Sequence, residues 1–524
     1  VTMHYSTPFT EHAFMEPECA IALPEHDGLL VYTASQSVYD EQREIATMLR
    51  LPLENIHCQA KLVGGGFGGK EDMSVQHHAA LMAWHTKQPV KVRFSRQESI
   101  MIHPKRHAME MEFTSACDEH GRLLALKATL LADTGAYASL GGPVLQRACT
   151  HAAGPYNYQH VDILGKAVYT NNVPAGAYRG FGVTQSCFAM ENNLNLLAEK
   201  VGISAWEIRY RNAIRPGQVL PNGQIADPNT ALEACLIAIR PAFEASPRTG
   251  IACAFKNSGF GVGVPDIGRC TLSVEQGVIH IRTSAACMGQ GLATVATQIV
   301  CETIDIDPSQ TFCEPADTRR TPDAGTSTAS RQTVITGEAI RKVALQLRKA
   351  LDEAGTIDAL EGREFHDEFT AVTDPMGSSK PNPKSHIAYS YSTQVVELNE
   401  QGKVTQVTAA VDVGTVVNPT AVEGQVEGGV IMGLGYALTE DYPIEGGYPK
   451  VTYGTLGLIR ANDAPPVHTI LVTSDQVSQE AYGAKGIGEL STIATAPAVQ
   501  NAYHRFDRIF RTKLPLPQTP YRKH

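Results

Sequence analysis

A run of glycines near residue 66 is the stretch of this sequence best suited to hold a ligand. Residues 64–71 read GGGFGGKE. Glycine adopts backbone angles that other residues avoid, so such a run can approach a ligand closely and expose N–H groups, which often bind an anion. The run fits the G-x-x-x-x-G-K pattern of a nucleotide P-loop, but Glu71 stands where that loop needs a serine or threonine to hold the metal. A dinucleotide-binding G-x-G-x-x-G turn and a flexible turn without a ligand are the other interpretations.

Further short segments, several of them rich in glycine, recur along the chain in the order of one known family. The run at 64–71 resembles the GGGFGGKE loop of the molybdenum hydroxylases, the xanthine dehydrogenase and aldehyde oxidoreductase family. The other matching segments are TPFTEH at 7–12, MEP at 15–17, AYRGFG at 177–182, MGQG at 288–291, TSTAS at 326–330, GQVEG at 424–428 and AKGIGE at 484–489. This resemblance, which covers about residues 7–520, implies an α+β fold. The implied fold consists of two large mixed α/β domains of the aldehyde oxidase/xanthine dehydrogenase molybdopterin-binding type.

The resemblance implies hydroxylation of an electron-poor carbon, in a purine-like heterocycle or an aldehyde, with oxygen taken from water. The pterin dithiolene holds the molybdenum, so no protein side chain is expected as a metal ligand. The protein binds the cofactor, places a base and orients the substrate. Glu489 occupies the position of the family's catalytic glutamate and is the predicted general base. The family usually continues with proline, whereas Leu490 follows here.

Seven residues fall on positions that bind the cofactor in the family. Neutral amide side chains suit the edge of the pterin ring, and glycine-flanked amides suit its phosphate. The implied cofactor is molybdopterin, in the plain or the cytosine dinucleotide form. The residues assigned to it by the resemblance are Gln36, Phe67, Gly68, Arg179, Gln290, Ala329 and Gln425.

Five residues fall on substrate-binding positions of the family. Glu71 and Arg147 match the acid and base that hold the purine ring in xanthine dehydrogenases, while Phe181 and Phe260 match the two rings that sandwich it. Such a pair can hydrogen-bond the N–H and carbonyl groups of a heterocycle, and two aromatic faces bury its plane. Gly261 stands where purine enzymes have threonine. Aldehyde-specific relatives typically lose the charged pair, so a xanthine- or hypoxanthine-like substrate is predicted; another N-heterocycle, such as a nicotinate-like acid, or an aldehyde is the alternative.

Composition fits a globular enzyme and excludes several other classes. The chain has 524 residues, of which 43% are hydrophobic and 19% charged, and its net charge of −10 includes no basic cluster for nucleic acid. An apolar run of about 18 residues and a signal peptide are both missing, so neither a membrane span nor secretion is expected. The eleven cysteines are scattered without a C-x-x-C motif, which indicates a reducing compartment and predicts a cytoplasmic protein.

Electron transfer implies partners that this sequence does not encode. In the family, iron–sulfur domains and a flavin domain precede this region, and Val1 at the start indicates a processed chain or a piece of a longer polypeptide. The resemblance therefore implies iron–sulfur clusters and FAD on partner chains or missing domains, and assembly into a higher oligomer. A cofactor-free scaffold protein is a further alternative, against which Glu489, Arg179 and Gln290 argue.

The elements that must position these residues can be placed in outline. Proline and glycine between Arg215 and Gly250 predict a boundary between a first molybdopterin-binding domain at 1–240 and a second at 241–524. The three histidines His77, His78 and His85 lie on one predicted helix, where a metal site is conceivable but hydrogen-bonded surface histidines are commoner. Helices are predicted at 74–86, at 185–201 (ended by Gly202), after a Ser204–Glu207 capping box, and at 337–354. Strands are predicted at 251–255, 270–282, 404–416 and 467–474. A surface loop is predicted at 373–386.

Overall fold

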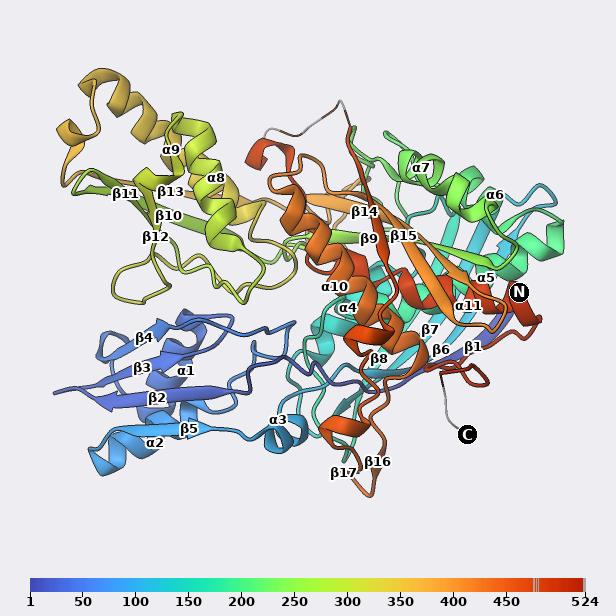
Figure 1. The fold of residues 1–524 in the computed structure, drawn as a ribbon, viewed down its shortest axis with the longest axis horizontal. Coiled ribbons are helices and arrows are strands. Elements are labelled where there is room, and N and C mark those ends of the chain that lie inside the picture. The colour runs from blue at the N-terminus through green and yellow to red at the C-terminus, as the bar shows by residue number, and fades with distance from the viewer. Residues whose placement is uncertain (475, 477, 479, 522–524) are drawn as a thin grey trace.

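The computed structural model describes residues 1–521 except 475, 477 and 479, and it is an α+β protein, as predicted. Most strands form four mixed sheets of four strands each. Figure 1 shows a larger body that carries both chain termini and two smaller units beside it. Within the described part of the chain, no helix is both long and apolar enough to cross a membrane.

Two sheets and six helices build the body. The first sheet has the order β1 (Thr2–Thr7), β6 (Ala108–Cys117), β7 (Leu123–Gly135) and β8 (His160–Tyr169). The second has the order β18 (Val467–Val472), β15 (Val404–Asp412), β14 (Ala388–Leu398) and β9 (Thr249–Ser258). The helices are α4 (Gly141–Thr150), α5 (Val183–Val201), α6 (Ala205–Asn212), α7 (Leu232–Glu244), α10 (Pro419–Leu438) and α11 (Thr495–Asp507).

The two sheets of the body are joined through packed helices. Helix α5 packs on β6 of the first sheet, α11 packs on β9 of the second, and the two helices contact each other. One continuous hydrophobic core results, which runs from Tyr5 through Phe188 and Val396 to Leu516 and so draws on both sides of residue 240. The predicted division of the chain between residues 240 and 241 stays a prediction.

Each smaller unit has a sheet, two helices and a core of its own (Figure 1). The lower unit contains β4 (Ile56–Ala60), β3 (Leu29–Thr33), β2 (Cys19–Pro24) and β5 (Val90–Arg93), with α1 (Val38–Leu49) and α2 (Gln76–Thr86). The upper unit contains β12 (Thr311–Cys313), β11 (Val278–Arg282), β10 (Asp266–Glu275) and β13 (Glu364–Ala371), with α8 (Leu292–Ile304) and α9 (Ile335–Ala354). Outside these sheets, α3 spans Arg96–Ile102, and β16 (Ile444–Glu445) and β17 (Tyr448–Pro449) form a two-stranded sheet.

Most predicted elements are present, and the departures have local causes. The segment predicted as one strand at 270–282 is a hairpin, because Gln276 and Gly277 turn the chain with positive φ. The strand predicted at 404–416 ends at Asp412. Ser204 caps α6 by accepting a hydrogen bond from Glu207 N (3.0 Å), but the Glu207 carboxylate pairs with Arg211 and does not complete a capping box.

The three histidines predicted to share one helix lie on α2. Among the described residues, the groups of three potential metal ligands close enough to share an ion exclude His77, His78 and His85. The rings of His77 and His78 lie 4.0 Å apart, centroid to centroid.

Candidate active site

The loops singled out in the sequence meet around one cavity of about 630 Å³. Several of them run directly into helices: 177–182 into α5, 288–291 into α8 and 326–334 into α9. Helix N-termini present free N–H groups and a partial positive charge, which suits an anionic ligand. Ten predicted site residues line the cavity, namely Gln36, Phe67, Gly68, Glu71, Arg179, Phe181, Gln290, Ala329, Gln425 and Glu489.

The glycine run is shaped by close packing against a second loop of the cavity. Phe67 and Gly68 have φ values of 56° and 100°, in the left-handed region. A Cβ atom on Gly68 would lie 2.8 Å from the carbonyl of Ala177, so a larger residue would collide with backbone. Arg179 N donates to Phe67 O at 2.9 Å, which fixes the two loops together.

The side-chain amide of Gln36 connects three parts of the cavity wall by hydrogen bonds. Its Nε2 donates to Ser327 O at 2.8 Å and to Glu71 Oε1 at 3.3 Å, and its Oε1 accepts from Gly68 N at 3.0 Å. Burial, together with the nearby Asp72 and Glu489 carboxylates, raises the pKa of Glu71 to about 8. Glu71 is therefore mostly a neutral acid at pH 7 and can donate a hydrogen bond.

Arg179 places a positive charge in the wall and joins two distant segments. Its Nε donates to Gly488 O at 2.6 Å, and its Nη2 donates to the backbone and side-chain oxygens of Gln425 at 2.9 and 3.1 Å. Burial lowers the pKa of Arg179 to about 10, which still leaves it charged at neutral pH.

The other two cofactor candidates sit in the same wall. Gln290 is held by its own loop, since Oε1 accepts from Met288 N at 2.6 Å and Nε2 donates to Ala286 O at 3.0 Å. Ala329 has a φ of 48°, a conformation that alanine rarely adopts. The Gln290 side chain therefore braces its own loop, and Ala329 shapes the cavity through its backbone.

Glu489 is a buried carboxylate with two hydrogen-bonding partners on one oxygen. Ser330 Oγ donates to Oε2 at 3.0 Å, and Lys256 Nζ lies 3.2 Å from the same oxygen. The sequence motifs did not point to Lys256, which directly follows the strand predicted at 251–255 and lies on β9 in the structure. The arrangement offers a positioned proton acceptor at the cavity.

Arg147, Phe260 and Gly261 are not among the residues that line the cavity. Arg147 Nη2 donates to Phe260 O at 2.6 Å, and Nη1 contacts His386 Nε2. A Cβ atom on Gly261 would lie 2.1 Å from the His386 ring, so the threonine of purine enzymes has no room here. His386 comes from the segment predicted as a surface loop, and nothing in the sequence indicated its buried position.

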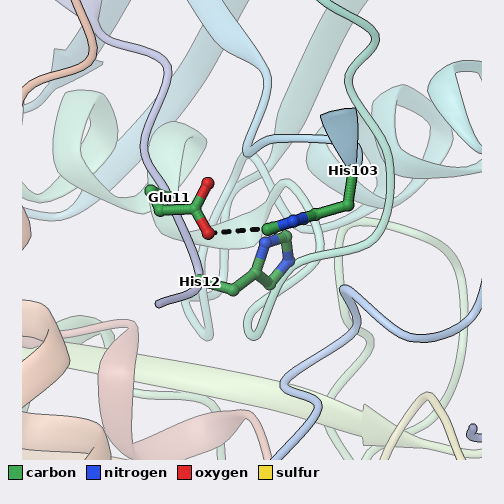
Figure 2. A group of neighbouring side chains, drawn as sticks. All are labelled: Glu11, His12 and His103. Atoms are coloured by element: carbon green, nitrogen blue, oxygen red, sulfur yellow. Dashed lines mark ion pairs between the residues drawn. The ribbon is translucent and has the colours of Figure 1, made fainter. Parts of the chain in front are cut away.

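A buried cluster of charged side chains (Glu11, Glu18, His103 and Lys105) supports the glycine run and the loop at 177–182. Figure 2 shows the Glu11 carboxylate directed at the His103 ring, with the His12 ring against it. His103 Nε2 lies 2.9 Å from Glu11 and its Nδ1 lies 3.1 Å from Glu18, while Lys105 Nζ lies 2.8 Å from Glu11. Two carboxylates thus face two cations, which fits an ion-pair network better than a metal site.

His12 links this cluster to the wall of the cavity. Its Nε2 lies 2.7 Å from Ala177 O, and its ring stacks on Tyr178 at 4.1 Å between centroids. A Cβ atom on Gly69 would lie 2.9 Å from the His12 ring, so the glycine run rests directly on it.

Comparison with known families matches almost the whole chain. A family model described as "Molybdopterin cofactor-binding domain" matches residues 1–213, and a second model with the same description matches 240–368 and 358–465. A probable xanthine dehydrogenase subunit of Bacillus subtilis (strain 168) is 32% identical, over 98% of this chain and 75% of that protein.

Two further relatives differ in the activity that their names state. The nicotinate dehydrogenase large molybdopterin subunit of Eubacterium barkeri is 41% identical over 44% of this chain and 54% of its own length. The solved structure of the aldehyde oxidoreductase from Desulfovibrio gigas superposes with a TM-score of 0.91 and 27% identity, over 98% of this chain and 60% of that one. The predicted fold type is thereby confirmed, and the chain spans about half to three quarters of these three relatives.

Proposed function

This chain belongs to the molybdenum hydroxylase family as a molybdopterin-binding part of such an enzyme, and we propose that it hydroxylates a purine-type N-heterocycle. The observation that carries the proposal is that Glu71, Phe181 and Glu489 line one cavity. Glu489 is the proposed base, Glu71 the group that binds a ring edge, and Phe181 the aromatic surface against the ring plane. A substrate resembling xanthine or hypoxanthine presents carbonyl and ring nitrogen acceptors to the neutral Glu71 acid.

The residues of the cavity fit molybdopterin, the cofactor of the matched domains. A Cβ atom on Gly289 or Gly424 would meet no atom within 4 Å, so these glycines leave open space along the wall. Arg179 adds positive charge, and Gln36, Gln290 and Gln425 add neutral donors and acceptors beside it. When bound, the cofactor supplies the two-electron oxidation; the chain binds it, orients the substrate and moves the proton. Either pterin form, plain or cytosine dinucleotide, is compatible with this proposal.

A heterocycle that carries a carboxylate is the second candidate substrate. Two cations, Lys256 and Arg147, lie close enough to Glu489 to interact with its charge. Neither side chain lines the cavity, but their positive charge would favour an anionic group bound in it. A relative named nicotinate dehydrogenase is 41% identical over part of the chain. An aldehyde substrate needs neither the cations nor Glu71.

Partners belong to the proposal as well. Relatives are named as subunits, which implies complexes of several chains. We infer that this chain passes electrons to an iron–sulfur protein or domain and then to a flavin protein, within a higher oligomer. The eleven cysteines lack the close spacing that holds an iron–sulfur cluster.

The test is to purify the native assembly, determine its molybdenum and pterin content, and screen xanthine, hypoxanthine, nicotinate and small aldehydes. Glu489→Gln should keep the cofactor and lose at least about 10³-fold in rate, near the upper range for removal of a general base. Glu400→Gln, on an exposed turn, is the matched control. Near-normal turnover of the Glu489 variant would refute the base, and preference for an aldehyde over every heterocycle would refute the substrate class.

A further inference from the structure

Lys256 is a charged side chain on β9, a strand that is buried along its whole length. All ten residues of β9 are buried, and Lys256 is 1% exposed. A buried ammonium is costly unless it is paired, so its partners show what holds it there. They are Glu489 Oε2 at 3.2 Å and Asn257 Oδ1 at 2.8 Å.

Ser330 reaches the same carboxylate oxygen from a strained loop. It has a φ of 50° and follows Ala329 at 48°, so two successive residues adopt a conformation that favours glycine. A Cβ atom on Gly486 would lie 2.2 Å from Ser330 O, which shows how tightly the loop before Glu489 packs on this segment. The Ser330 hydroxyl then donates to Glu489 Oε2 at 3.0 Å.

Both donors therefore act on Oε2, and among the described residues no hydrogen bond is made to Oε1. Two partners on one oxygen fix the plane of a carboxylate and leave its other oxygen free. We propose that Lys256 is a positioning residue for Glu489, whose Oε2 it holds so that the ionised carboxylate presents Oε1 to the reacting group. In this role Oε1 takes the proton and Lys256 keeps its own. The inference rests on the proposed function of Glu489 as base.

The charges around the pair agree with this assignment. Burial lowers the pKa of Lys256 to about 8, with Arg147 acting in the same direction and Glu489 against it, so the ammonium is charged at neutral pH. His151 and His386 also face this group, and burial lowers the pKa of each well below its usual value, which makes both neutral. On the cavity side, the charge of Glu489 also acts on Arg179 and Glu71.

Three variants of the holoenzyme test the assignment. Lys256→Met should lower kcat by about 10–100-fold, the scale of a misplaced catalytic group, with KM within about threefold and molybdenum content unchanged. The acid limb of its kcat/KM profile should move up by about one pH unit or more, because an opposite charge is lost. Lys256→Arg should restore most of the rate. Lys342→Met removes a lysine on α9 that pairs with Asp367 on β13; it is the matched control and should change neither kcat nor the pH profile.

A second readout does not need turnover. Carbodiimide modifies carboxyl groups in their protonated form, and peptide mass spectrometry reports the modification of Glu489 in the cofactor-free chain. In Lys256→Met, modification should begin at a higher pH by about one unit or more, and Ser330→Ala should shift it in the same direction. Ser330→Ala also serves if Lys256→Met does not fold.

The outcomes separate the two proposals. Unchanged labelling together with kcat within about threefold of wild type in Lys256→Met would overturn the positioning role, since an opposite charge at this distance should be felt. A purely structural ion pair would lower stability in Lys256→Met and Lys256→Arg alike while kcat stays within about threefold of wild type, and this outcome would also overturn the positioning role. Normal turnover in Glu489→Gln would refute the base itself, while the labelling shift would remain measurable.

Discussion

At the scale of single residues, Glu71 shows how the cavity changes the chemistry of a familiar side chain. Burial comes first among the causes that raise its pKa to about 8, and Asp72 and Glu489 add to the shift. Below that pH it is an acid that can donate as well as accept. A purine carbonyl or ring nitrogen is a suitable acceptor.

Glu71→Gln should therefore keep kcat/KM for the purine within about fivefold at neutral pH, because a side-chain amide, like a neutral acid, offers both a hydrogen-bond donor and an acceptor. Glu71→Leu should lose about 10–100-fold, since it leaves substrate groups unpaired. Wild-type activity should fall as the pH rises through about 8, where Glu71 ionises, and the Gln variant should lack this loss. A large defect of Glu71→Gln at neutral pH would show instead that the ionised carboxylate is needed.

The ten site residues at the cavity were assigned from the sequence, nine of them because they lie in short matching segments whose backbone shape is local, while Gln36 lies outside those segments. The sequence could not give the position of Arg147, since the partners of this side chain, Phe260 O and His386, are more than 100 residues away along the chain. Lys256 was missed for the same reason: its pairing with Glu489 exists only once β9 and the loop at 484–489 are folded together.

At the scale of elements, the cavity depends on loops that are held by neighbours outside it. The cluster of Glu11, Glu18, His103 and Lys105 joins the segment after β1 to the end of α3. Burial alone would raise the pKa of Glu11, but His103 and Lys105 lower it well below its usual value. Burial and Lys105 oppose protonation of His103, but Glu11 and Glu18 outweigh them and raise its pKa.

Glu11→Gln should cost about 3–5 kcal/mol of local stability, because it leaves buried cations without their partner. The contribution of Glu11 is present above the pKa of an unfolded glutamate, about 4.3, and is lost as the pH falls through its lowered folded value. That of His103 is present below about 6.5 and is lost as the pH rises through its raised folded value. Hydrogen exchange in peptides covering 9–18 and 99–107 measures both effects.

Glu112→Gln is the control for this experiment. Glu112 pairs with His4 on exposed strands, with side chains 47% and 79% exposed, so the variant should change stability by less than about 1 kcal/mol. Equal protection in Glu11→Gln and wild type would contradict a supporting role for the cluster. In the sequence, TPFTEH at 7–12 was recognised only as a matching motif. Nothing in it indicated that Glu11 and His12 pack beneath the glycine run.

At the scale of the whole molecule, the cavity is assembled from the body and both smaller units. Gln36 and Phe67 come from loops of the lower unit, and Gln290 and Ala329 come from loops of the upper unit. Gln425 lies on α10 of the body. Strand and helix periodicity predicted most elements, but not that three packed units would share one site. That arrangement depends on long-range contacts, such as the bridge between Gln59 and Asp317, which local patterns do not contain.

The last prediction concerns what this assembly must bind in order to turn over. The proposed reaction removes two electrons from each substrate, and they must leave the chain before the next cycle. Among the described residues, no group of three potential metal ligands includes a cysteine, and the sequence has no C-x-x-C motif. The native complex should therefore contain an iron–sulfur protein or domain, and a flavin protein, at fixed ratio to this chain. Its visible spectrum, iron and flavin content and subunit masses measure this directly. A preparation of this chain alone, free of iron, that sustains many turnovers with an ordinary electron acceptor would contradict the requirement.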